Sequence, residues 1–177
     1  MDVEIRLNNL RFLDEALAAG AEAVSVGDEG CVHRVPRPRA LRRAFDLIIE
    51  SGTRARLVTP RVAESELPVI LRAVDEAVAF GSAFDIVVND PGVLNYLRRL
   101  SPTRRPRVFL GRAMVRSVAD CPWNTYTLRQ EREEARTRIL RHSYDHHRKL
   151  RLLSALGVGG VEVNNQPAVA ESVGRVA

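Results

Sequence analysis

The sequence predicts an α/β fold in which parallel strands alternate with helices. Six short apolar runs are separated mostly by stretches with helical spacing, and each run ends at polar residues. Alternating strands and helices indicate a parallel sheet, because parallel neighbours require a crossover connection. Ligands of such sheets bind beyond the carboxyl ends of the strands. We therefore expect the polar residues that follow the runs to gather at one rim.

The predicted strands share an apolar run and a polar ending. In chain order they are 3–7, 23–26, 55–58, 84–88, 108–110 and 160–163. The residues at or just beyond their ends are Asn8, Asn9, Gly27, Asp28, Cys31, Thr59, Asn89, Asp90, Gly111, Arg112, Glu162, Asn164 and Asn165. These residues supply the candidate site.

The predicted helices follow from apolar periodicity and from glycine or proline near their ends. They cover 10–20, 39–50, 64–80, 93–100, 128–141 and 144–156, with a long loop at 112–126. Pro68 falls in the first turn of the third helix, where proline is tolerated. Asp90 is a good N-cap for the fourth, so its polarity also has a structural explanation.

Composition indicates one domain, 1–177, with 45% hydrophobic residues and a single substantial core. No apolar run approaches the ~20 residues of a membrane span, and the start of the chain lacks a signal-peptide pattern. We therefore expect a cytoplasmic protein without membrane association. The formal charge is +5, but no basic stretch interleaves aromatic residues, so nucleic acid is not the expected partner.

The loop after the second predicted strand is the densest candidate for chemistry. It combines Asp28, Cys31, His33 and Arg34 within seven residues. A thiol beside cationic side chains can act as a nucleophile or as a metal or cluster ligand. The alternative is a polar turn with an incidental cysteine. No classical zinc motif is present, because no second cysteine lies nearby.

Other strand ends offer polar groups for binding. Asn89 can hydrogen-bond a ligand, and Arg112 can hold a carboxylate or phosphate. Both also have structural explanations: Asn89 could be part of a helix cap, and Arg112 could be an ordinary surface arginine. Glu162 and Asn164 alternate with valines, so both are expected to face the rim or the interior of the curved sheet.

A histidine pair supplies the remaining candidate. His142 and His146 are spaced as metal ligands on a helix, but their basic neighbours favour a solvated helix.

Several segments resemble the collagenase-like peptidase superfamily, and most closely its branch that assists oxygen-independent ubiquinone hydroxylation. They are 17–27, the Cys31-x-x-Arg34 motif, 87–94, 110–112 and 156–162. The resemblance implies a TIM-barrel-like fold. That fold typically takes ~250 residues. This chain is shorter and has about six predicted strands, so we expect an incomplete barrel.

The resemblance also implies a cofactor and a partner. Cys31 stands where that branch has the first cysteine of a four-cysteine iron–sulfur cluster, but this chain has only two cysteines. A cluster is therefore expected only if it is shared with a partner or another subunit, and no other cofactor is predicted. Unpaired edge strands predict a homo-oligomer or association with a related barrel subunit.

The sequence is compatible with two functions. The first is an enzyme, or an enzyme subunit, acting on a small polar or anionic metabolite at the rim. Its catalytic candidates are Glu162, Asp28 and Cys31, and its binding candidates are Asn8, Arg34, Asn89, Arg112 and Asn164. The second is a non-catalytic subunit that completes or stabilises a related iron–sulfur barrel protein. No constellation for peptide hydrolysis is identifiable.

Overall fold

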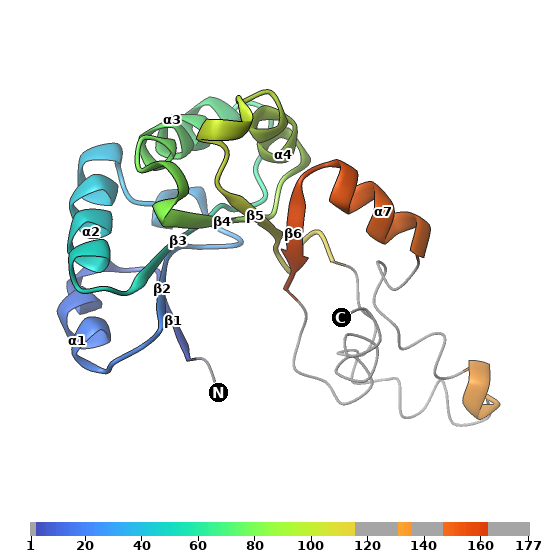
Figure 1. Ribbon diagram of the computed structural model, residues 1–177, viewed down its shortest axis with the longest axis horizontal. Helices are drawn as coiled ribbons and strands as arrows, with labels where there is room; N and C mark the ends of the chain where they lie inside the picture. The colour runs from blue at the N-terminus through green and yellow to red at the C-terminus, as the bar shows by residue number, and fades with distance from the viewer. Residues whose placement is uncertain (1–2, 116–130, 136–146, 163–177) are drawn as a thin grey trace.

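A computed structural model describes residues 3–115, 131–135 and 147–162. In this part of the chain, six parallel strands form one sheet in the order β1-β2-β3-β4-β5-β6 (Figure 1). The strands are β1 (Glu4–Leu7), β2 (Ala23–Gly27), β3 (Arg54–Val58), β4 (Phe84–Val88), β5 (Arg107–Leu110) and β6 (Val158–Val161). The predicted parallel α/β fold is confirmed.

Helices follow the strands as predicted. They are α1 (Leu13–Ala18) after the short turn η1 (Leu10–Phe12), α2 (Pro38–Glu50), α3 (Leu67–Val78), α4 (Pro91–Arg98) and α7 (His147–Ala155). The N-cap prediction for α4 is confirmed, because Asp90 Oδ1 accepts from the backbone of Gly92 at 2.7 Å and of Val93 at 3.4 Å. Most of the predicted helix 128–141 lies outside the described residues, as do Cys121, His142, His146 and Asn164.

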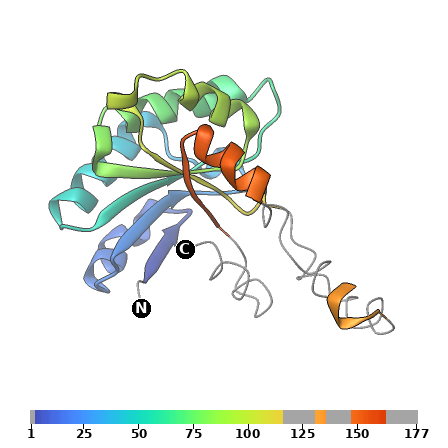
Figure 2. The same cartoon turned by 45° about the vertical axis from the view of Figure 1, so that its right-hand side comes forward.

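The sequential strand order places α1 to α4 on one face of the sheet (Figures 1 and 2). The apolar core lies between that face and the helices. Phe45 of α2 is fully buried there. The centroid of its ring lies 5.5 Å from that of Phe80 and 5.6 Å from that of Phe84. Other fully buried members are Val24, Val26, Leu41, Ile48, Leu57, Ile70, Val74 and Ile86.

The opposite face of the sheet carries charge. Matching positions on β1 to β5 hold Arg6, the neutral Ser25, Arg56, Asp85 and Arg107, and we call the four charged residues among them the charged row. Period-2 alternation explains it, because the neighbours of these residues along each strand point into the core.

The sheet curves so that its first strand and the end of its last strand approach each other. Arg6 Nη2 on β1 donates to Glu162 Oε1, directly after β6, at 2.7 Å. A contact between the two edges of the sheet is consistent with an incomplete barrel. The charged row then occupies the face that a closed barrel turns toward its interior.

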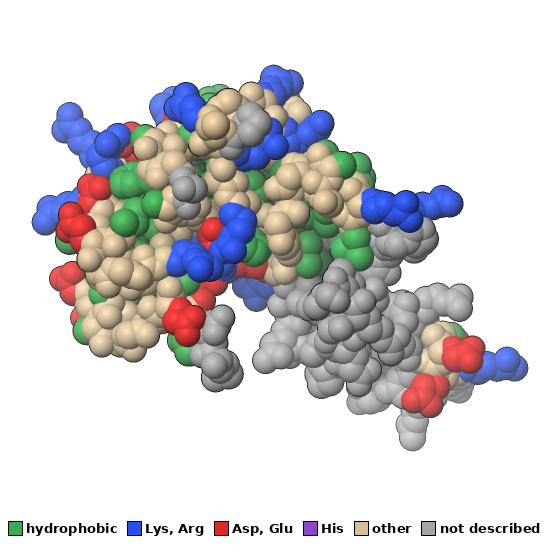
Figure 3. All heavy atoms as spheres, in the orientation of Figure 1, with side chains coloured by type: hydrophobic (Ala, Val, Ile, Leu, Met, Phe, Trp, Pro, Cys, Tyr) green, Lys and Arg blue, Asp and Glu red, His purple; other side chains and the backbone are tan. Residues whose placement is uncertain are grey.

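None of the helices in the described ranges has the length and apolar character needed to cross a bilayer. On the face shown in Figure 3, basic side chains are spread over several elements, with acidic side chains among them.

Candidate functional site

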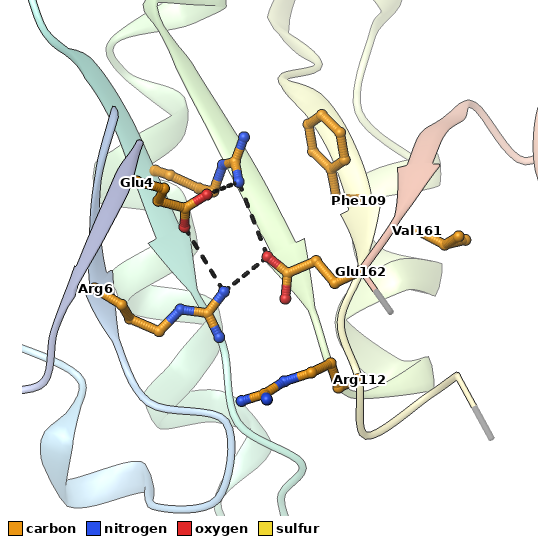
Figure 4. Close-up of a pocket in the computed structure, with 7 residues that line it drawn as sticks. Glu4, Arg6, Phe109, Arg112, Val161 and Glu162 are labelled. Atoms are coloured by element: carbon orange, nitrogen blue, oxygen red, sulfur yellow. Dashed lines mark hydrogen bonds and ion pairs between the residues drawn. The ribbon is translucent and has the colours of Figure 1, made fainter. Parts of the chain in front are cut away.

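Two adjoining clefts lie at the polar face and at the carboxyl ends of the strands. The larger, of about 660 Å³, is lined by Glu4, Arg6, Arg56, Phe109, Arg112, Val161 and Glu162 (Figure 4). The smaller, of about 330 Å³, is lined by Arg6, Asn8, Gly27, Asp28, Glu29 and Arg112. Because Arg6 and Arg112 line both clefts, we treat them together as the rim site.

Four charged side chains of alternating sign run through the rim site. Arg6 donates through Nη2 to Glu162 and through Nη1 to Glu29, and Arg112 Nε donates to Glu29 Oε1 at 3.2 Å. We call the series Glu162–Arg6–Glu29–Arg112 the ion chain. Its members come from β1, from the loop after β2, and from the residues just beyond β5 and β6. The topology therefore joins four distant segments at one place.

The loop that presents Glu29 is held by its own hydrogen bonds. Asp28 Oδ1 accepts from the backbone of Gly30 at 2.9 Å, and the carbonyl of Glu29 accepts from the backbone of Arg61 at 3.0 Å. These contacts place the carboxylate of Glu29 between the two arginines of the ion chain.

Glu162 has the most unusual environment of the candidate residues. Only 16% of its side chain is exposed, and Oε2 has no hydrogen-bond partner among the described residues. Burial raises the pKa of Glu162; Arg6 lowers it, and the nearby carboxylates of Glu4 and Glu29 raise it, so that the net shift is upward. A carboxyl group with a raised pKa in a cleft is a candidate for proton transfer.

Arg6 stays charged in this arrangement. Burial lowers its pKa, but the ion pairs with Glu162, Glu29 and Glu4 outweigh that effect and raise it overall. The arginine can therefore hold Glu162 in place whether or not the carboxyl group carries a proton.

The raised pKa of Glu162 predicts a pH dependence of stability. In the folded protein the group keeps its proton to a higher pH than the unfolded value of about 4.3. Its contribution to stability is therefore greatest below that value and falls as pH rises through the folded pKa. We expect Glu162→Gln to remove this fall, measured as melting temperature against pH from about pH 4 upward.

The matched control is Glu76→Gln, which removes a carboxylate paired with Arg42 on the helical layer. If Glu162→Gln leaves the dependence of melting temperature on pH unchanged, or if Glu76→Gln changes it as much, Glu162 is not the group responsible for the fall.

The structure brings four of the predicted site residues to the rim site: Asn8, Asp28, Arg112 and Glu162. Cys31 and Arg34 line neither cleft. Arg34, with 57% of its side chain exposed, reaches back to Asp28 Oδ2 at 3.3 Å. Cys31 is half-buried before the short turn η2 (Val32–Arg34) and forms no disulfide with a described residue. Asn164 lies outside the described residues.

Asn89 has a different place from the one predicted. It is fully buried and lines neither cleft. Its Nδ2 donates to the carbonyl of Thr59, and its Oδ1 accepts from the backbone of Ala113, both at 3.0 Å. A Cβ atom at Gly111 would lie 2.2 Å from that Oδ1. The amide therefore joins the segments that follow β3 and β5, and its role in binding a ligand stays a prediction.

Sequence reasoning missed the polar residues inside the strands. Glu4, Arg6 and Arg56 line the larger cleft, yet they fall within apolar runs or beside them. The available signal was alternation: Glu4 and Arg6 are two residues apart, as are Arg54 and Arg56. Strands of a parallel sheet that is covered on both faces usually read as continuous apolar runs, so alternation marks an uncovered or polar face.

Comparison of the chain with protein-family models, curated proteins and solved structures found no match. The resemblance to the collagenase-like peptidase superfamily therefore stays a prediction. Among the described residues, no group of three or more histidine, cysteine, aspartate or glutamate side chains is arranged to hold a metal ion.

Proposed function

We propose that the chain is an enzyme, or an enzyme subunit, that acts on a small polar or anionic metabolite in the rim site. The observation that carries this proposal is Glu162. It is a largely buried carboxyl group with a raised pKa, in a cleft at the carboxyl ends of the strands. Clefts at this end of parallel strands are the usual place for ligands.

Each candidate residue then has a role that its position allows. Glu162 accepts or donates a proton, and Arg6 holds its carboxyl group through Oε1. Arg112, half-exposed at the junction of the two clefts, contacts an acidic group of the substrate. Asn8 and Asp28 contribute polar groups to the smaller cleft.

A binding screen tests this proposal. We expect a panel of small acids, phosphate esters, sugars and amino acids to contain a compound that raises the melting temperature of the full chain. The double variant Arg112→Ala/Glu162→Ala should lose that shift. The matched double variant Arg42→Ala/Glu76→Ala, which removes an ion pair between α2 and α3, should keep it. A shift that survives the loss of Arg112 and Glu162 shows that this is not the site.

The alternative is a non-catalytic subunit that completes a related iron–sulfur barrel protein. It is favoured by the edges of the sheet, since β1 and β6 each pair with one neighbouring strand in the described part of the chain. Native mass spectrometry of anaerobically purified protein separates the two. A related subunit or a cluster supports the alternative, with Cys31 as a shared ligand, and a bare homo-oligomer or monomer contradicts it.

A further inference from the structure

The four charges of the ion chain are already balanced before any ligand binds. In the ion chain each arginine contacts a carboxylate, and each carboxylate contacts an arginine. A simple anion that bound Arg112 would bring a second negative charge beside Glu29, whose carboxylate already accepts from Arg112 Nε. That carboxylate is only 20% exposed, so water screens the repulsion between the two anions poorly. The arrangement therefore opposes ligands that carry negative charge alone.

Two unsatisfied atoms belong to the same cleft. Arg56 Nε, a donor, and Glu162 Oε2, an acceptor, are buried and have no hydrogen-bond partner among the described residues. Both side chains line the larger cleft. Buried polar atoms are rarely left without a partner. A ligand with a donor group supplies the partner that Glu162 Oε2 lacks.

We propose that the rim site binds a zwitterion, a small compound that carries one ammonium and one carboxylate group, as amino acids do. This inference rests on the proposed function and narrows its substrate class. The carboxylate of the ligand contacts Arg112, which has the most exposed side chain of the ion chain at 52%. The ammonium group contacts Glu29 and Glu162. Insertion adds one ion pair at Arg112 and one at each of the two carboxylates, so no charge loses its partner.

Matched ligands test the inference by titration calorimetry on the full chain at neutral pH. One set is γ-aminobutyrate, butyrate and butylamine, and the other is L-alanine, propionate and ethylamine. We expect the zwitterion of at least one set to bind about tenfold or more tightly than both singly charged analogues, as one charge-assisted hydrogen bond allows.

Single variants show whether the discrimination comes from the ion chain. Arg112→Gln should weaken zwitterion binding about tenfold, and Glu29→Gln should remove the preference for the zwitterion over the simple acid. Arg42→Gln and Glu76→Gln are the controls, because they break a comparable exposed ion pair between α2 and α3.

Two outcomes overturn the inference. If in both sets the acid or the amine binds as tightly as its zwitterionic partner, the substrate class is wrong, while the proposed function still stands. If none of the six compounds binds, the inference also fails, and the proposed function is then decided separately by the wider screen with the Arg112→Ala/Glu162→Ala variant.

Discussion

Replacing Asp85 with alanine is expected to lower the free energy of unfolding by about 3 kcal/mol, because it removes one partner of a buried ionic cluster. Asp85 is the acidic member of the charged row, and only 6% of its side chain is exposed. It accepts from Arg107 Nε at 3.0 Å and Nη2 at 2.7 Å, and from Arg56 Nη2 at 3.4 Å. The hydrogen bond to Asp85 raises the pKa of Arg107, consistent with this pairing.

Asp85→Ala leaves Arg107 and Arg56 in different surroundings. Arg107 is 49% exposed and can turn toward water, whereas the side chain of Arg56 is 13% exposed and would keep only its acidic neighbours Glu4 and Glu162. Both guanidinium groups also lie over the ring of Phe109, 4.8 Å and 5.0 Å from its centroid. Loss of Asp85 should therefore also disturb the wall of the larger cleft.

Urea unfolding of the full chain measures the effect. The matched control is Asp75→Ala, which removes an exposed carboxylate that accepts a hydrogen bond from Tyr96 on the helical layer. We expect that control to cost less than about 1 kcal/mol. Asp85→Asn keeps the shape of the side chain, so its loss of unfolding free energy should lie between those of Asp85→Ala and Asp75→Ala. Equal losses for Asp85→Ala and Asp75→Ala would show that the charged row does not stabilise the sheet.

Gly27→Ala is expected to cost at least about 3 kcal/mol, because it adds a steric clash to backbone strain. Gly27 is the last residue of β2 and has a φ of +122°. A Cβ atom there would lie 2.2 Å from the carbonyl oxygen of Val58 on the adjacent strand. The backbone of β2 or β3 must move to admit it. Because Asp28 and Glu29 follow directly, the movement should also weaken ligand binding at the rim site.

Gly20→Ala separates strain from the clash. Gly20 also has a positive φ, +71°, but a Cβ atom there would meet nothing within 4 Å. We expect this control to cost about 1 kcal/mol, from the left-handed conformation alone. Urea unfolding compares the two variants. If both lose the same stability, the close approach of β2 and β3 at Gly27 is not the cause.

The fold was predictable from local patterns, because the helices and strands of this topology follow one another along the chain. Apolar runs located the strands, and Gly20 and Asp90 marked helix ends. The last strand shows where prediction from local patterns becomes inaccurate. It was predicted at 160–163 but spans Val158–Val161, because Gly159 and Gly160 interrupt its apolar pattern.

The site was only partly predictable, because its contacts join residues far apart in the sequence. The polar ending of a strand indicates the rim, which is where Arg112 and Glu162 lie. The same rule could not show that Asn89 is buried, because its partners Thr59 and Ala113 follow two other strands. Nor could it show that Arg6 contacts Glu162, since that contact depends on how far the sheet curves.

The contact between Arg6 and Glu162 also bears on the order of folding. It spans 156 positions of the sequence, whereas most of the sheet is built from neighbouring strands joined by short crossovers. Closing so long a loop is entropically unfavourable until the intervening elements are in place. The contact should therefore form after the rate-limiting step, so that its removal speeds unfolding and leaves the refolding rate nearly unchanged. During synthesis, the ion chain cannot be complete until residue 162 has left the ribosome, so the rim site is the last part of the described fold to form.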